Sequence, residues 1–123
     1  MLSVAAALLG AGEVLAVDID PEAVIVTRAN AEANGVAPQI RVGEGSIERI
    51  HGPFDVVLAN IGAAVLTDLA PLIATVVAPG GHVVLAGMLL DQVPGVVAAF
   101  AAGGLTVVGA DELDGWGSAV LRR

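Results

Sequence analysis

The sequence contains no cysteine, no tyrosine and no lysine, and these absences exclude several kinds of site. Without cysteine the chain forms no disulfide, holds no metal through thiolates and has no thiol nucleophile. Its only basic side chains that stay charged are five arginines, against 13 aspartates and glutamates, which gives a formal net charge of −8. Because nucleic-acid binding depends on neutralising phosphates with Lys and Arg, we expect no direct binding of DNA or RNA.

Patterns typical of metal sites and membrane spans are missing as well. His51 and His82 stand far apart, and neither has the spacing to a second ligand that metal sites show. The mean hydropathy is +0.86, but the longest apolar run, residues 61–77, contains Asp68 and Pro71 and is short for a membrane span. We interpret it as a buried helix. The first residues lack the basic leader of a secretory signal, so we expect a cytoplasmic protein. From the patterns above we expect neither membrane binding nor a metal site.

What the sequence does contain is an alternation of apolar, strand-like runs and Ala-rich stretches. With 123 residues, of which 56% are hydrophobic, the chain is long enough for one domain and too apolar to be disordered. No linker or repeat divides it, so we expect a single domain over residues 1–123. The pattern predicts helices at 2–10, 21–34, 62–77 and 90–103, and strands at 13–18, 39–43, 54–59, 81–87, 105–111 and 116–122.

This order of elements predicts an α/β fold. The runs "DVVLAN" and "HVVLAG" are apolar without alternation, as in strands covered on both faces of a parallel sheet. Asp20 before Pro21 is typical of a helix start, Gly35 of a helix end, and "PGG" at 79–81 of a turn before the next strand. "DELDG" joins the last two strands as an antiparallel hairpin. We therefore expect a doubly wound, Rossmann-like sheet, mostly parallel, with an antiparallel C-terminal hairpin.

Ligands of doubly wound sheets bind beyond the carboxyl ends of the strands, which directs attention to "VLAVDIDPEAV" at residues 14–24. Asp18 ends the predicted strand, where a carboxylate can accept hydrogen bonds from both hydroxyls of a nucleotide ribose. Asp20 is expected to cap the following helix instead. The alternative is that both acids only terminate the strand.

Three further positions carry groups suited to ligand binding. In "VGEGSIERI", Ser46 offers an amide and Ile47 an apolar wall to an adenine, although a plain turn is the alternative. Asn60 follows an apolar strand, and its carboxamide offers an acceptor and two donors beside a reacting amine. A role as helix N-cap would explain Asn60 equally well. Trp116, the single tryptophan, is suited either to a pocket wall or to the core.

The segments "VDIDPEAV", "EGSIE", "PFDVVLANI", "LAPLIA" and "PGGHVVLAGML", with the closing tryptophan strand, together resemble the class I S-adenosylmethionine-dependent methyltransferases. More narrowly, their order and spacing over residues 1–123 resemble the PrmA-like family, which methylates the eleventh protein of the bacterial large ribosomal subunit. The resemblance implies a Rossmann-like methyltransferase fold and S-adenosylmethionine as methyl donor. It also implies that amines of a large-subunit ribosomal protein are the acceptors.

The same resemblance assigns roles to single residues of this chain. It implies cofactor-binding positions at Asp18, Ile19, Ser46, Ile47 and Asn60. Asn60 matches the asparagine of the family's N-I-L motif, which lies by the methyl donor and the incoming amine, and is therefore the implied catalytic residue. Gly87 matches the glycine of the family's S-G-I-L segment at the pocket rim. We expect Gly87 and Trp116 to line the substrate pocket.

The sequence departs from the family pattern at its start and at two glycines. Gly62 stands where the family commonly has leucine, and Gly115 replaces the glutamate that precedes the tryptophan. The family's first strand and its D-x-G-x-G-x-G loop would precede "LSVAAALLGA", whereas this sequence begins at Met1. Gly10 and Gly12 do not replace that loop, because they follow a helix and precede a strand.

A sheet without that first strand has consequences for its neighbours. In the usual strand order it lies between the strands that end at Asp18 and Asn60, so we expect each of these two to have an unpaired edge. We interpret the sequence as an N-terminally truncated methyltransferase domain, either a fragment or a reading frame begun at an internal methionine, whose own activity the residues do not establish.

Two other functions are compatible with the same residues. One is a methyltransferase for another amine or a small molecule, because the motif at Asn60 does not name the acceptor. The other is a non-catalytic, Rossmann-like interaction module that acts through exposed strand edges or apolar surface. A nicotinamide dehydrogenase would also explain Asp18, but it requires G-x-G-x-x-G after a first strand, and the sequence has none.

Overall fold

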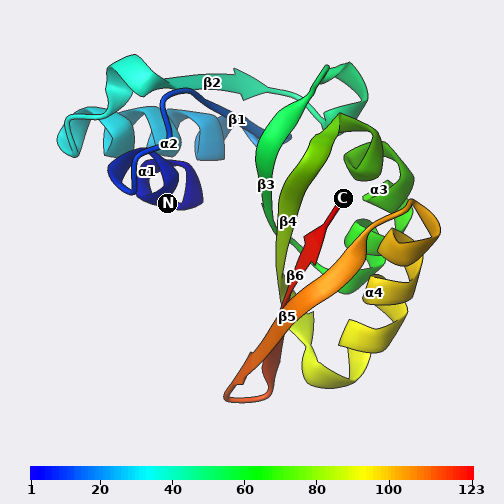
Figure 1. Cartoon of the computed structure of the whole chain (residues 1–123). Coiled ribbons are helices and arrows are strands. Elements are labelled where there is room, and N and C mark those ends of the chain that lie inside the picture. Colours follow the sequence, from blue (N-terminus) through cyan, green and yellow to red (C-terminus); the bar gives the residue numbers. More distant parts are fainter. The chain divides into compact units, whose positions relative to one another are not determined.

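Helices and strands alternate along the computed structural model, which describes residues 1–123 (Figure 1). Their contacts divide the chain into two units, Met1–Arg49 and Ile50–Arg123. The first unit contains α1 (Leu2–Leu8), β1 (Val14–Asp18), α2 (Pro21–Ala33), η1 (Ala37–Gln39), β2 (Ile40–Glu44) and η2 (Ile47–Arg49). The second contains β3 (Phe54–Asn60), α3 (Ala63–Val76), β4 (Val77–Leu89), η3 (Leu90–Gln92), α4 (Val93–Ala102), β5 (Thr106–Leu113) and β6 (Trp116–Arg122). The single domain expected from the sequence stays a prediction.

In the first unit, α1 and α2 pack against a parallel pair of strands, β1 and β2. The core of this unit is formed by Val4, Ala7, Ala31, Val36 and Ile40. The helix α2 begins where the sequence predicts, because the Oδ1 atom of Asp20 accepts a hydrogen bond from the N–H of Glu22 at 2.9 Å.

The second unit is built on a four-stranded sheet in the order β3-β4-β6-β5. β3 and β4 are parallel, whereas β6 runs antiparallel to both β4 and β5. Apolar side chains of α3 and α4, such as Leu66 and Phe100, are fully buried together with Val83, Leu85 and Leu121 of the sheet. The α/β class, the parallel pairs and the antiparallel C-terminal hairpin are thus confirmed.

Two predicted boundaries are wrong. β4 begins at Val77, which already pairs with Phe54, so residues 79–81 form a bulge inside the strand and not a turn before it. Pro79 lacks the N–H group that a regular ladder requires, and Gly80 has a φ of +75°. The helix expected from residue 90 likewise starts with the separate turn η3, and α4 begins only at Val93.

β1 and β3 each lie at the edge of their own sheet. β1 pairs only with β2, and β3 only with β4. This confirms the unpaired edges expected for the strands that end at Asp18 and Asn60.

The run of residues 61–77 is confirmed as a helix over Ala63–Val76, but only one face of α3 is buried, with Leu66, Ala70 and Ile73. None of the helices combines the length and the apolar character that crossing a membrane requires.

The packing of α3 generates a stability prediction. Leu66 is 0% exposed, whereas Leu72 on the same helix is 38% exposed. Leu66→Ala should lower the free energy of unfolding by about 2–5 kcal/mol because it leaves a cavity in the core. Leu72→Ala is the matched control and should lower it by less than half as much. Urea unfolding followed by circular dichroism measures both, and equal losses would contradict the assignment of the core.

Candidate functional site

Asp18 lies at the carboxyl end of β1 and is held in place by its neighbours. Its backbone carbonyl accepts a hydrogen bond from the N–H of Gly45 at 2.9 Å, which ties the loop after β2 to this strand end. Its Oδ1 atom accepts one from the N–H of Asp20 at 2.9 Å. The Oδ2 atom is left for a ligand. Asp20 caps α2, as predicted. The predicted binding of a ribose by Asp18 stays a prediction.

The other predicted cofactor-binding residues of the first unit lie at the same end of its sheet. Ile19 follows Asp18 directly and is 76% exposed. Ser46 and Ile47 follow β2, and instead of a plain turn they lead into the turn of 3-10 helix η2. The hydroxyl of Ser46 hydrogen-bonds the carboxylate of Glu48, which is the main reason why the pKa of Glu48 is lowered. Binding of adenosine by these residues stays a prediction.

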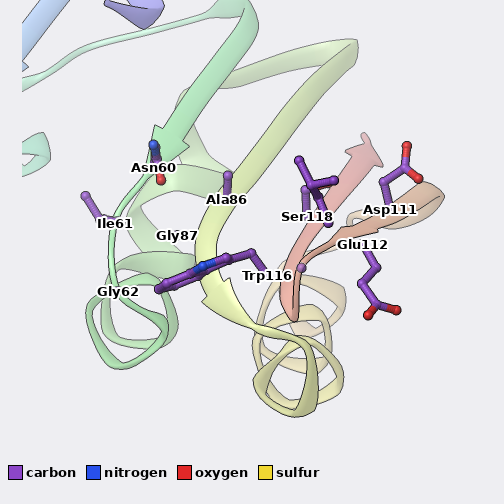
Figure 2. Close-up of a pocket in the computed structure, with 11 residues that line it drawn as sticks. Asn60, Ile61, Gly62, Ala86, Gly87, Asp111, Glu112, Trp116 and Ser118 are labelled. Carbon is purple, nitrogen blue, oxygen red and sulfur yellow. The ribbon is translucent and has the colours of Figure 1, made fainter.

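The second unit contains a pocket of about 840 Å³ at the carboxyl end of β3 (Figure 2). Its walls come from residues 60–62 after β3, residues 86–87 of β4, and residues 111–113 and 116–118 of the β5–β6 hairpin. The three residues that the sequence assigns to this region, Asn60, Gly87 and Trp116, therefore line one pocket. Their roles in catalysis and substrate binding stay predictions.

Asn60 and Gly87 fit together closely. A Cβ atom at Gly87 would lie 2.7 Å from Oδ1 of Asn60 and 2.8 Å from the carbonyl oxygen of Ile61. Gly87 also has a φ of +85°, which side chains rarely adopt. The N-cap residue of α3 is Gly62 and no side chain caps that helix, so the interpretation of Asn60 as a cap is wrong. Its carboxamide is free to face a ligand.

Trp116 is 56% exposed and stands at the start of β6, so the interpretation of this residue as core is wrong. The preceding turn consists of Asp114 and Gly115, with φ of 52° and 81°. Two consecutive positive φ values are typical of a type I′ hairpin turn, for which Asp-Gly is a preferred pair. The departure from the family at Gly115 thus has a local structural reason, and it brings Trp116 opposite Leu113.

The other departure, Gly62, leaves the site intact. A Cβ atom at this position would have no neighbour within 4 Å. The larger side chain of the family would therefore fit, and its absence widens the pocket beside Asn60.

The structure adds residues that sequence reasoning missed. Asp111, Glu112 and Ser118 also line the pocket. Asp111 pairs with Ser118 across β5 and β6, and consecutive residues of a strand point to opposite faces, so Asp111 and Glu112 point in opposite directions (Figure 2). The sequence feature that could have indicated the two acids is the run "DELDG", which was interpreted only as the connection of a hairpin. No group of His, Asp or Glu side chains is arranged to hold a metal ion.

The two groups of candidate residues belong to different units. Asp18, Ile19, Ser46 and Ile47 lie in the first, and Asn60, Gly87 and Trp116 in the second. The first group lies at the carboxyl ends of β1 and β2, whereas in the second group Asn60 ends β3, Gly87 lies near the end of β4 and Trp116 begins β6. That both groups face one common crevice stays a prediction.

Comparison with known proteins places these residues in a family context. The model of the family "Ribosomal protein L11 methyltransferase (PrmA)" matches residues 1–123. A ribosomal protein L11 methyltransferase of Citrifermentans bemidjiense is 52% identical over 100 residues, covering 81% of this chain and 33% of that protein. One of Pelotomaculum thermopropionicum is 46% identical over 117 residues, covering 94% and 38%. The chain thus spans little more than a third of the length of these relatives.

Solved structures agree. The crystal structure of a ribosomal protein L11 methylase from Lactobacillus delbrueckii subsp. bulgaricus matches with a TM-score of 0.93 at 31% identity, over 99% of this chain and 63% of that one. An RNA methyltransferase from Salinibacter ruber, in complex with S-adenosyl-L-homocysteine, matches with a TM-score of 0.76 at 20% identity, over 98% and 72%. The second likeness shows the fold alone. Together they show a methyltransferase fold.

The close fit at Gly87 generates a prediction. Gly87→Ala should lower the free energy of unfolding by about 1–3 kcal/mol, because the new Cβ strains the backbone and displaces residues 60–61. Gly95→Ala in α4 is the control: its Cβ meets no atom within 4 Å, and it should raise stability by about 0.5–1 kcal/mol. Urea unfolding measures both, and a neutral Gly87→Ala would contradict the described fit.

Proposed function

Because this chain belongs to the ribosomal protein L11 methyltransferase family, we propose that it forms part of an enzyme that transfers methyl groups from S-adenosylmethionine to amines of a large-subunit ribosomal protein. The observation that carries the proposal is the pocket in which Asn60, Gly87 and Trp116 meet. These are the positions that the family resemblance assigns to the methyl donor and the acceptor. The proposed location is the cytoplasm, without direct binding of nucleic acid or membrane.

The residues of the first unit have the chemistry that the cofactor requires. S-Adenosylmethionine presents an adenine, two ribose hydroxyls and a sulfonium cation. The free Oδ2 of Asp18 suits the ribose hydroxyls, because a carboxylate accepts two such bonds strongly. The exposed side chain of Ile19 offers apolar surface beside it. Ser46 and Ile47 supply the adenine side, as the family resemblance implies.

The chain's contribution to the reaction is alignment and exclusion of water. When bound, the cofactor supplies a methyl group that its sulfonium already activates. The carboxamide oxygen of Asn60 would accept an N–H of the incoming amine and so orient the nitrogen lone pair for attack on the methyl group that the bound cofactor would supply. Asn60 does this without ionising, and no strong base is needed.

Cofactor binding tests the assignment of Asp18. We expect the chain to bind S-adenosylhomocysteine, and Asp18→Asn to weaken binding by about 1–3 kcal/mol, roughly 5- to 150-fold in Kd, through loss of charge-assisted hydrogen bonds. Asp20→Asn makes the same chemical change two residues away and keeps a good helix cap. It should leave Kd unchanged within about twofold. Isothermal titration measures all three, and no binding by the unaltered chain, or equal losses in both variants, would refute the assignment.

Methyl transfer tests the assignment of Asn60. Asn60→Ala should slow transfer to the ribosomal protein by about 100-fold, because the amine loses its alignment, while the Kd for S-adenosylhomocysteine changes by less than about threefold. Asn34→Ala, which removes a carboxamide from the end of α2, should leave transfer unchanged. Single-turnover assays with labelled cofactor measure the rates. Equal losses in rate and cofactor affinity, or transfer undiminished by Asn60→Ala, would contradict the assignment.

A further inference from the structure

The end of the β5–β6 hairpin presents a group of exposed apolar side chains. Leu113 is 74% exposed, and it pairs across the hairpin with Trp116. On the other side of β6, Trp116 pairs with Leu89 of β4, which is also exposed. Because register partners on neighbouring strands lie on the same face of a sheet, these three side chains form a continuous surface. We call Leu89, Leu113 and Trp116 the hairpin patch.

The hairpin patch leads directly into the pocket. Leu113 and Trp116 belong to the patch and also line the pocket that contains Asn60. Figure 2 shows Trp116 in this pocket. A segment seated on the patch would therefore reach the pocket with its next side chain. Grouped, exposed apolar residues at the rim of a pocket are typical of an interaction surface.

Exposed carboxylates lie next to the hairpin patch: Asp91, Asp111 and Asp114. Asp111 stands two residues before Leu113 on the same face of β5, and Asp114 belongs to the hairpin turn. Asp91 belongs to η3, which is attached to the hairpin turn by a hydrogen bond from the N–H of Leu90 to the carbonyl of Gly115 at 3.0 Å. The negative charge is therefore concentrated at the mouth of the pocket.

Basic side chains lie elsewhere on this unit. Its only arginines are Arg122 and Arg123 at the end of β6, and Arg122 pairs with Thr106 at the far end of the hairpin. The patch therefore attracts cationic groups, and the exposed Trp116 ring adds a face on which a cation can rest.

We propose that the hairpin patch docks a basic peptide segment, with lysine or arginine side chains beside an apolar residue, that carries the acceptor amine. This inference rests on the proposed function and names how the same site selects its substrate. Charge complementarity decides between occupants: a second copy of the chain carries the same net charge of −8, and nucleic acid is an anion, so both are repelled. Contacts of exposed charges mainly speed association and weaken in salt.

Trp116 makes the test direct, because it is the only tryptophan of the chain. The full chain, without cofactor, is titrated with a short peptide of lysine, leucine and glycine, and with the same peptide carrying glutamate in place of every lysine. We expect the lysine peptide to change Trp116 fluorescence saturably, and its Kd to rise by about tenfold between about 50 mM and 500 mM salt. The glutamate peptide should cause no change. Equal binding of both peptides would overturn the proposal.

Matched charge variants separate the patch from the general negative charge. The pair Asp91→Asn and Asp114→Asn should weaken binding of the lysine peptide by about fivefold. The control pair Asp55→Asn and Asp68→Asn removes two exposed carboxylates outside the patch and the pocket, and should leave the Kd unchanged. Equal weakening by both pairs would overturn the proposal.

A failure of the docking proposal can be distinguished from a failure of the proposed function. If S-adenosylhomocysteine binds but the lysine peptide does not, only the docking role is refuted, because peptide binding is measured without cofactor. In methyl transfer, the variant pair at Asp91 and Asp114, which lie outside the pocket lining, should raise KM for the protein acceptor about fivefold and leave kcat unchanged, as expected for docking. A loss confined to kcat would also overturn the proposal.

Discussion

The close passage of β4 beside the chain that leaves β3 is the constraint on which the second unit depends. Only a residue without a side chain fits at Gly87, because a Cβ there would lie 2.7 Å from Asn60 Oδ1, and only glycine adopts its φ of +85° at little cost. This contact fixes where Asn60 stands. Since β4 also pairs with β6, the same strand sets the position of Trp116 on the opposite wall. A side chain at Gly87 would therefore displace Asn60, on one wall of the pocket.

Most elements were predictable because their signals are local. Asp20 and Pro21 predict the start of α2, because helix capping involves neighbouring residues alone, and the structure shows that cap. The same reasoning assigned the cap to Asp20 and ribose binding to Asp18, and only the cap is shown so far. The strand β4 was predicted too short, because its first residue is set by pairing with Phe54, a partner distant in the sequence that no local pattern reveals.

The candidate site was predictable only in part for the same reason. Asn60 had two interpretations, and the choice depended on whether the helix after it begins at once or, as observed, after Gly62. Trp116 directly follows a two-residue turn and lines the pocket at the start of β6. The residue type alone does not indicate this exposed position. Asp111 and Glu112 were missed because they reach the pocket only through the position of the β5–β6 hairpin, which depends on contacts distant in the sequence.

The two strands with a bare edge, β1 and β3, have a consequence for the chain in solution. Each presents unpaired backbone groups, a template on which an identical strand can add in register and begin ordered aggregation. The mutual repulsion of chains that each carry a net charge of −8 opposes such growth. The net charge of the chain therefore opposes association through these edges, and concentrated salt weakens that opposition.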